Sequence, residues 1–124
     1  MALIERSAAP VPPTLPRLTV AVAELGGEVI VRGMLLSERM ALSALSADLA
    51  DVQAGETAEQ AQRRAGREIV FYTLSRCVVL ADDAPLYTAA QWDAFGAQHP
   101  GAVLDLYKHA RQLGGHDEDD NAKN

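Results

Sequence analysis

Histidines, a cysteine and an adjacent pair of aspartates are the residues of this chain best suited to catalysis or metal binding. His99, His109 and His116 lack the spacing of a metal site, because a whole predicted helix separates the first two. Asp82 and Asp83 are adjacent, which in most backbones points their carboxylates apart, and a turn accounts for both residues. We therefore identify no catalytic, metal-binding or cofactor-binding residue in the sequence, and we predict that the protein is not an enzyme.

The single cysteine and a calcium-loop-like segment near the C-terminus also have structural explanations. Cys77 lies in an apolar stretch with no base near it in sequence, so we expect a buried, unreactive thiol. Asp117, Asp119 and Asn121 match the first half of a calcium loop, but Ala122 stands where such a loop requires Gly. A solvated acidic tail explains these residues better.

Arginines are clustered at positions 63, 64 and 67, where they could attract an anionic partner. Glu59 and Arg63, and Arg64 and Glu68, are each four residues apart and so are spaced for ion pairs along a helix. The alternative interpretation, which the spacing favours, is a solvated face with ion pairs. The formal net charge of −6 argues against binding to nucleic acid, because neutralising phosphates requires a concentrated basic face.

Composition indicates one soluble domain: the chain has 124 residues, of which 48% are apolar and 23% are charged. The longest apolar run, residues 69–81, contains Arg76 and is shorter than the roughly 20 residues of a membrane span. The N-terminus carries charges where a signal peptide would have its apolar core. We therefore expect a cytoplasmic protein whose partners include neither membrane nor nucleic acid.

Three segments differ in composition. Residues 1–17 are rich in Pro and small residues, which favours a flexible, extended arm. Residues 18–113 have the periodic apolar pattern of a single globular domain. Residues 114–124 are polar and acidic, and we expect them to be disordered.

Alternating apolar residues at the start of the domain predict a β-hairpin. Leu18, Val20 and Val22 share one face of the first strand, and Val29 and Val31 share one face of the second, after a Leu-Gly-Gly turn. Two strands alone are marginally stable in water, so the Val face must pack on a helix.

Two helices are expected in the middle of the chain. Ser37 as the N-cap predicts a helix over residues 38–52, whose apolar stripe is formed by Leu42, Leu45, Leu49 and Val52. After Gly55, the capping box of Thr57 and Gln60 predicts a long helix over residues 58–80. The second half of this helix is apolar almost all round, so we expect it to be the central helix.

A helical hairpin is predicted at the C-terminal end of the domain. Thr88 and Gln91 form another capping box, which starts a helix at about Ala89 and places Trp92 and Phe95 on one face. A turn at residues 82–85 leads into it.

The second helix of the hairpin should begin at Pro100, which is tolerated at a first helical position, and end where Gly114 and Gly115 can adopt a left-handed cap. Its apolar stripe consists of Val103, Leu106 or Tyr107, Ala110 and Leu113. The predicted fold is α+β and mostly α, with an N-terminal β-hairpin packed on a small bundle of about four helices.

The order of these parts resembles that of the tail assembly chaperones of long-tailed bacteriophages and related prophages. The resemblance covers the chain from about Leu18 to the C-terminus. It rests on the hairpin, the acidic end and four segments: Leu36-Ser-Glu-Arg39, Asp82-Asp-Ala-Pro-Leu-Tyr-Thr88, Trp92-Asp-Ala-Phe-Gly96 and Val103-Leu-Asp-Leu-Tyr107. Such proteins often carry Gly before that Pro, where this chain has Ala84.

The resemblance implies a protein without an active site that coats the helical tape measure protein and keeps it soluble. It also implies recruitment of tail tube subunits through a longer product, made when ribosomes slip back one nucleotide near the end of the gene. Ala122-Lys123-Asn124 could be encoded by a run of adenines that permits such a slip, and the tail from Gly114 would then be a linker. A second copy of the chain is a further candidate partner.

The candidate partner-binding residues are four aromatic residues, because aromatic side chains are enriched at the centres of interfaces. They are Tyr87, Trp92, Phe95 and Tyr107. A purely structural role in the core is the alternative for all four. Two other functions also remain open: another prophage morphogenesis component, such as a minor tail or connector protein, and a regulatory module that binds a small ligand.

Overall fold

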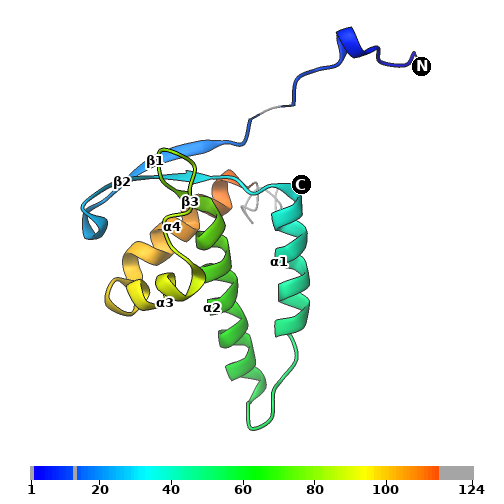
Figure 1. Ribbon diagram of the computed structural model, residues 1–124. Coiled ribbons are helices and arrows are strands. Elements are labelled where there is room, and N and C mark those ends of the chain that lie inside the picture. The colour runs from blue at the N-terminus through cyan, green and yellow to red at the C-terminus, as the bar shows by residue number, and fades with distance from the viewer. Residues whose placement is uncertain (1, 13, 115–124) are drawn as a thin grey trace.

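The computed structural model describes residues 2–12 and 14–114 and has the predicted α+β, mostly α architecture (Figure 1). Within these residues, short 3-10 turns lie at Arg6–Ala8 and Ala23–Leu25. The strands are β1 (Arg17–Val22), β2 (Gly27–Arg32) and β3 (Val78–Val79), and the helices are α1 (Leu36–Leu49), α2 (Ala58–Cys77), α3 (Ala89–Gln98) and α4 (Pro100–Leu113). The sheet is antiparallel with the strand order β1-β2-β3.

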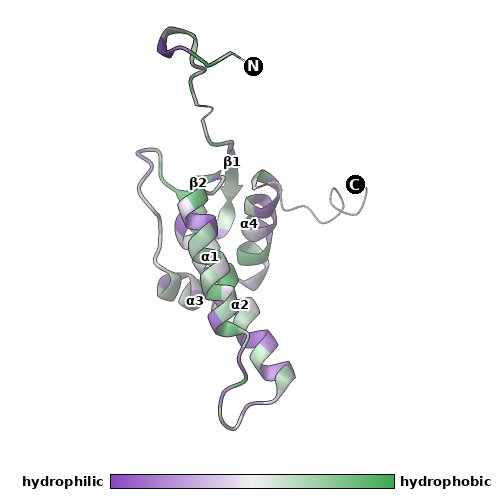
Figure 2. Ribbon diagram, turned by 90° about the vertical axis from the view of Figure 1, so that its right-hand side faces the viewer, coloured by the Kyte–Doolittle hydropathy of each residue, from purple (hydrophilic) through white to green (hydrophobic). Residues whose placement is uncertain are grey.

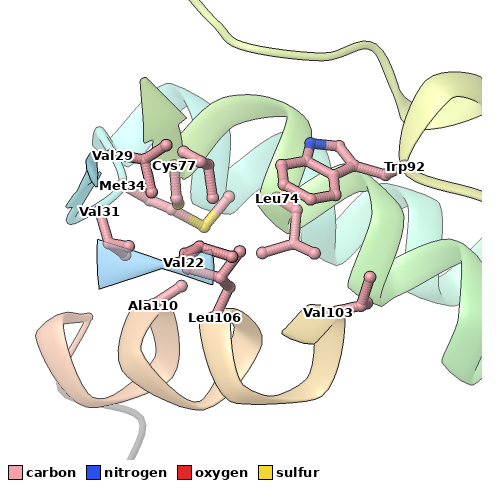
Figure 3. Packing of buried hydrophobic residues seen from close by; sticks show 11 residues of the cluster. Val22, Val29, Val31, Met34, Leu74, Cys77, Trp92, Val103, Leu106 and Ala110 are labelled. Carbon is pink, nitrogen blue, oxygen red and sulfur yellow. The ribbon is translucent and has the colours of Figure 1, made fainter. Parts of the chain in front are cut away.

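The predicted β-hairpin is confirmed. Leu18 pairs with Val31 and Val20 with Val29, so the apolar residues of the two strands share one face. Gly26, with a φ of 77°, supplies the left-handed residue of the turn. Figure 3 shows where this face packs: Val22 and Val31 lie against Leu106 and Ala110 of α4.

The long central helix ends earlier than the sequence predicts. α2 begins at Ala58 with the predicted capping box but ends at Cys77 rather than at residue 80. Val78 adopts an extended conformation and pairs with Val31, and Val79 pairs with Ile30. Two β-branched residues next to the open edge of β2 gain more from pairing there than from extending the helix, because they are stiff in a helix and suited to a sheet.

α1 differs from its predicted bounds and cap. It spans Leu36–Leu49 instead of residues 38–52, and the N-cap position is Leu35, not Ser37. The Glu38 carboxylate accepts a hydrogen bond from the Leu35 N–H at 2.8 Å and two from the Arg32 guanidinium at 2.8 and 2.9 Å. The helix therefore starts where a strand residue can hold Glu38 at its first turn.

Packing of α1 is confined largely to α2, as the two views agree (Figures 1 and 2). Leu42, Leu45 and Leu49 are only half-buried against it, and no residue of α1 is fully buried. Val52, predicted as part of the stripe, lies beyond the helix and is 52% exposed. Figure 2 shows the loop between α1 and α2 at the end of the molecule away from the sheet, where the first turns of α2 are hydrophilic.

α3 and α4 agree closely with the sequence prediction. The Thr88 hydroxyl accepts from the Gln91 N–H at 3.2 Å, and the Gln91 side chain accepts from the Thr88 N–H at 2.9 Å. α4 begins at Pro100 and ends at Leu113, but Gly114 has a φ of −80° and is not the predicted left-handed cap. The Gly114 N–H donates to the Ala110 carbonyl at 3.1 Å, which continues the helical pattern by one more bond.

The N-terminal arm leads away from the domain in Figure 1, with residues 2–12 exposed. Its last residues contact the domain: the Pro16 carbonyl accepts from the Gly33 N–H at 2.9 Å, and Arg17 forms an ion pair with Asp83. The predicted acidic tail lies outside the described residues apart from Gly114. No helix in the described part of the chain has the length and apolar character needed to cross a membrane.

Candidate partner-binding site

Three of the four predicted aromatic residues meet in one cluster. The ring of Trp92 lies 5.0 Å from that of Tyr87 and 5.6 Å from that of Phe95, and both pairs are close to perpendicular. Tyr107, on α4, is not part of this cluster, and its ring instead faces the guanidinium of Arg111 at 5.7 Å. Edge-to-face pairs of this kind stabilise a fold by about 0.5–1.5 kcal/mol each beyond the buried area.

Trp92 is enclosed, with 0% of its surface exposed, whereas Tyr87, Phe95 and Tyr107 are half-buried. Figure 3 shows the indole beside Leu74 of α2, so the Trp92 side chain joins α3 to the central helix as well as to α4. In this conformation the residues of the predicted set that a partner can reach are Tyr87, Phe95 and Tyr107. Their role in binding stays a prediction.

An apolar groove, which is not predicted from the sequence, runs between α2 and the α3–α4 pair. Its volume is about 660 Å³. One wall is a stripe of α2 with helical spacing: Arg63, Gly66, Arg67, Val70 and Phe71. The other wall consists of Asp93, Gly96 and Ala97 of α3 and Pro100, Val103 and Leu104 of α4.

The apolar end of this groove leaves side chains partly uncovered. Val70 and Phe71 are half-buried, and Leu104 is 60% exposed. A Cβ atom at Gly96 would lie 3.2 Å from Cγ2 of Val103, so the glycine permits α3 and α4 to approach closely at the groove wall. Residues 63, 66, 67, 70 and 71 have helical spacing in the sequence, but the sequence pattern predicts that the apolar residues of this stripe lie in the core.

The arginine cluster divides into paired and unpaired members. Arg63 forms the predicted ion pair with Glu59. Arg64 does not pair with Glu68 as predicted, but binds Glu56 at 2.9 and 3.1 Å, and this hydrogen bonding lowers the pKa of Glu56. Within the described residues Arg67 makes no hydrogen bond or ion pair; its charge contributes to the lowered pKa of Glu56, and its side chain lines the groove.

The cysteine, Asp82 and two of the histidines each have contacts that explain them as structural residues. Cys77 is fully buried, as predicted, and burial raises its pKa to about 11, so the thiol is protonated at neutral pH. Asp82 caps the predicted turn by accepting from the Ala84 N–H at 3.0 Å. His109 lies 3.6 Å from Asp105, and the ring of His99 lies 5.0 Å from that of Phe95 at a tilt of 44°. No three metal-binding side chains converge among residues 2–12 and 14–114; residues 115–124, with the calcium-loop-like segment, lie outside this range.

Comparisons with protein-family models, with curated proteins and with solved structures find no match to this chain. The groove and the aromatic cluster, which contributes no residue to the groove walls, are therefore interpreted from their own geometry and chemistry.

Proposed function

We propose that this protein is a tail assembly chaperone of a long-tailed phage or prophage that binds a helix of the tape measure protein in the groove between α2 and α3–α4. The observation that supports this proposal is the groove itself, apolar at Val70, Phe71 and Leu104 and open to solvent. Amphipathic helices place their apolar faces in grooves of this kind.

The dimensions of the groove suit a short stretch of helix. From residue 63 to residue 71, α2 rises by about 12 Å, which matches roughly two turns of a bound helix. A tape measure protein is far longer, so several copies of the chain would bind along it. Each copy would cover apolar surface, and the net charge of −6 would add repulsion between the coated complexes.

The further roles implied by the resemblance belong to the same proposal. The chaperone acts in the host cytoplasm, and a frameshifted longer product recruits tail tube subunits through an added domain. The gene sequence tests this second role. The idea fails if no slippery run lies near the stop codon, or if the alternative frame closes without coding for a domain.

The groove also supports one competing function, a module that binds a small ligand. Its volume of about 660 Å³ lies within the range of small-molecule sites. Such sites usually combine apolar walls with several convergent polar groups, whereas here the charged residues are limited to Arg63, Arg67 and Asp93. A metabolite that raises the melting temperature by several degrees in a thermal-shift screen would favour the ligand-binding function.

Co-expression with the tape measure protein of the same phage tests the chaperone proposal. We expect wild-type chain to keep the tape measure soluble and to co-purify in several copies. Leu104→Asp places a charge in the groove at a residue that is 60% exposed, so it should abolish co-purification with little effect on folding.

Met40→Asp is the matched control, because Met40 is 64% exposed and lies on α1, away from the groove. A tape measure that is equally soluble without the chain would contradict the proposal. Equal co-purification with Leu104→Asp and wild type would contradict the assignment of the groove.

A further inference from the structure

Gly66 lies in the interior of α2, where glycine is less favourable than alanine. A Cβ atom built on Gly66 would have no neighbour within 4 Å, and its φ is not in the left-handed region. Neither packing nor backbone conformation within the described structure therefore requires glycine here. Gly66 lines the groove, so a molecule bound in the groove could explain why glycine occupies this position.

Other helical glycines differ from Gly66. At Gly96, the close approach of Val103 within the chain itself explains why the residue is glycine. Gly101 also has open space, but it lies in the first turn of α4 and does not line the groove. Gly66 alone among the three combines a helix-interior position, open space and a place in the groove wall.

We propose that Gly66 is the point at which a bound helix crosses α2 in close backbone contact, and that Arg67 beside it pairs with an acidic residue of that helix. This inference rests on the proposed function of the groove. Gly96 and Ala97 on the facing wall carry little side-chain bulk, so the bound helix can lie deep between the two walls.

Charge gives the bound helix a direction. Arg67 on α2 and Asp93 on α3 line the groove, and neither forms an ion pair within the described residues. A helix with an acidic residue opposite Arg67 and a basic residue opposite Asp93 satisfies both charges, whereas the reversed helix places like charges together. The preferred partner is thus an amphipathic helix with a small residue at its closest contact with α2, an acidic residue near Arg67 and a basic residue near Asp93.

A synthetic peptide provides a probe that does not depend on the tape measure protein. A labelled amphipathic peptide of about 18 residues holds enough turns to fill the groove. It carries an apolar face of Leu and Ala, Ala at its centre and Glu one turn away; a second peptide carries Lys in place of that Glu. Binding of each to the full chain is measured by fluorescence anisotropy at low and high salt.

Gly66→Ala separates folding from binding. We expect the substitution to raise the melting temperature by about 2–6 °C, because it favours the helix, and to weaken peptide binding at least tenfold, because the methyl group blocks the crossing point. Gly101→Ala is the matched control and should leave peptide binding unchanged. Wild-type affinity in Gly66→Ala, or no binding of either peptide to the wild-type chain, would overturn the proposal.

Arg67→Gln tests the charge. It should remove the preference for the Glu peptide over the Lys peptide, whereas Lys108→Gln, which makes the same change in net charge outside the groove, should retain it. An equal preference for the Glu peptide in the two variants would refute the ion pair.

The peptide and co-expression experiments distinguish this inference from the proposed function. If the peptide binds but the chain does not keep the tape measure protein soluble, only the chaperone function is refuted. If Gly66→Ala keeps the tape measure protein as soluble as the wild type does, only the crossing point is refuted.

Discussion

Replacing Trp92 tests the packing on which both the fold and the groove depend. The indole is fully buried and makes perpendicular contacts with Tyr87 at 5.0 Å and Phe95 at 5.6 Å. Truncating a buried Trp to Ala costs about 3–5 kcal/mol. Domains of this size are stable by about 5–15 kcal/mol in total, so Trp92→Ala should remove a large share and lower the melting temperature by at least about 12 °C.

Trp92→Phe separates the loss of ring packing from the effect of the unpaired indole N–H. The indole Nε1 is buried and has no hydrogen-bond partner within the described structure. Leaving such a group unsatisfied costs about 1–3 kcal/mol, so Phe loses ring contacts but also removes this penalty. We expect Trp92→Phe to be clearly more stable than Trp92→Ala.

Urea unfolding followed by circular dichroism measures these differences, because Trp92 is the only tryptophan and its fluorescence is lost in both variants. Leu104→Ala, at a largely exposed position, is the control and should change stability by less than about 1 kcal/mol. If Trp92→Ala unfolds within experimental error of the wild type, the packing of α3 on α2 described above is wrong.

Three further predictions follow from local features. The hydrogen bonds from Arg32 lower the pKa of Glu38 below its ordinary 4.5, so their stabilisation is present above that pH and is lost as the pH falls through the lower folded value. Glu38→Gln should therefore lower the free energy of unfolding by about 1–3 kcal/mol at pH 7 and by progressively less in acid. A difference between variant and wild type that stays constant from neutral pH into acid would contradict this. Cys77, with its pKa raised to about 11 and no exposed surface, should react with a thiol reagent at pH 8 only after denaturation, and labelling of the folded chain at the rate of a free thiol would refute its burial. Thr88→Ala removes the hydroxyl that accepts from the Gln91 N–H and should lower the urea midpoint by an amount equivalent to about 0.5–2 kcal/mol, whereas an unchanged midpoint would show that the cap is dispensable.

Elements with local signals could be predicted closely from the sequence. The capping boxes at Thr57 and Thr88 and the break at Pro100 depend on residues within one turn of each other, and all three mark helix starts in the structure. The hairpin was equally visible, because alternation of apolar residues reports its buried face.

Boundaries that depend on distant residues could not be predicted in the same way. Val78 and Val79 leave the helical pattern because β2, more than forty residues earlier, offers an edge for pairing. Leu35 replaces Ser37 at the start of α1 because Arg32 holds Glu38 in place. Both outcomes are decided by tertiary contacts that override local preference.

The candidate site was predictable only in part. The spacing of Tyr87, Trp92 and Phe95 on α3 and its entry turn brings them together, but none of them lines the groove, and their role in binding stays a prediction. The groove requires the relative placement of α2, α3 and α4, which no local pattern specifies. Its one sequence signal is the stripe that joins Arg67 to Val70 and Phe71 through helical spacing.

Hydrogen exchange of the full chain, with and without the tape measure protein of the same phage, tests the central proposal most directly. Binding of a helix in the groove predicts slower amide exchange in residues 63–71 and 93–104, with little change in α1 and the β-hairpin. Loss of this protection in Leu104→Asp but not in Met40→Asp would link it to the groove. Unchanged exchange along the whole chain, or protection confined to α1 or the hairpin, would contradict the proposal that this groove binds the tape measure protein.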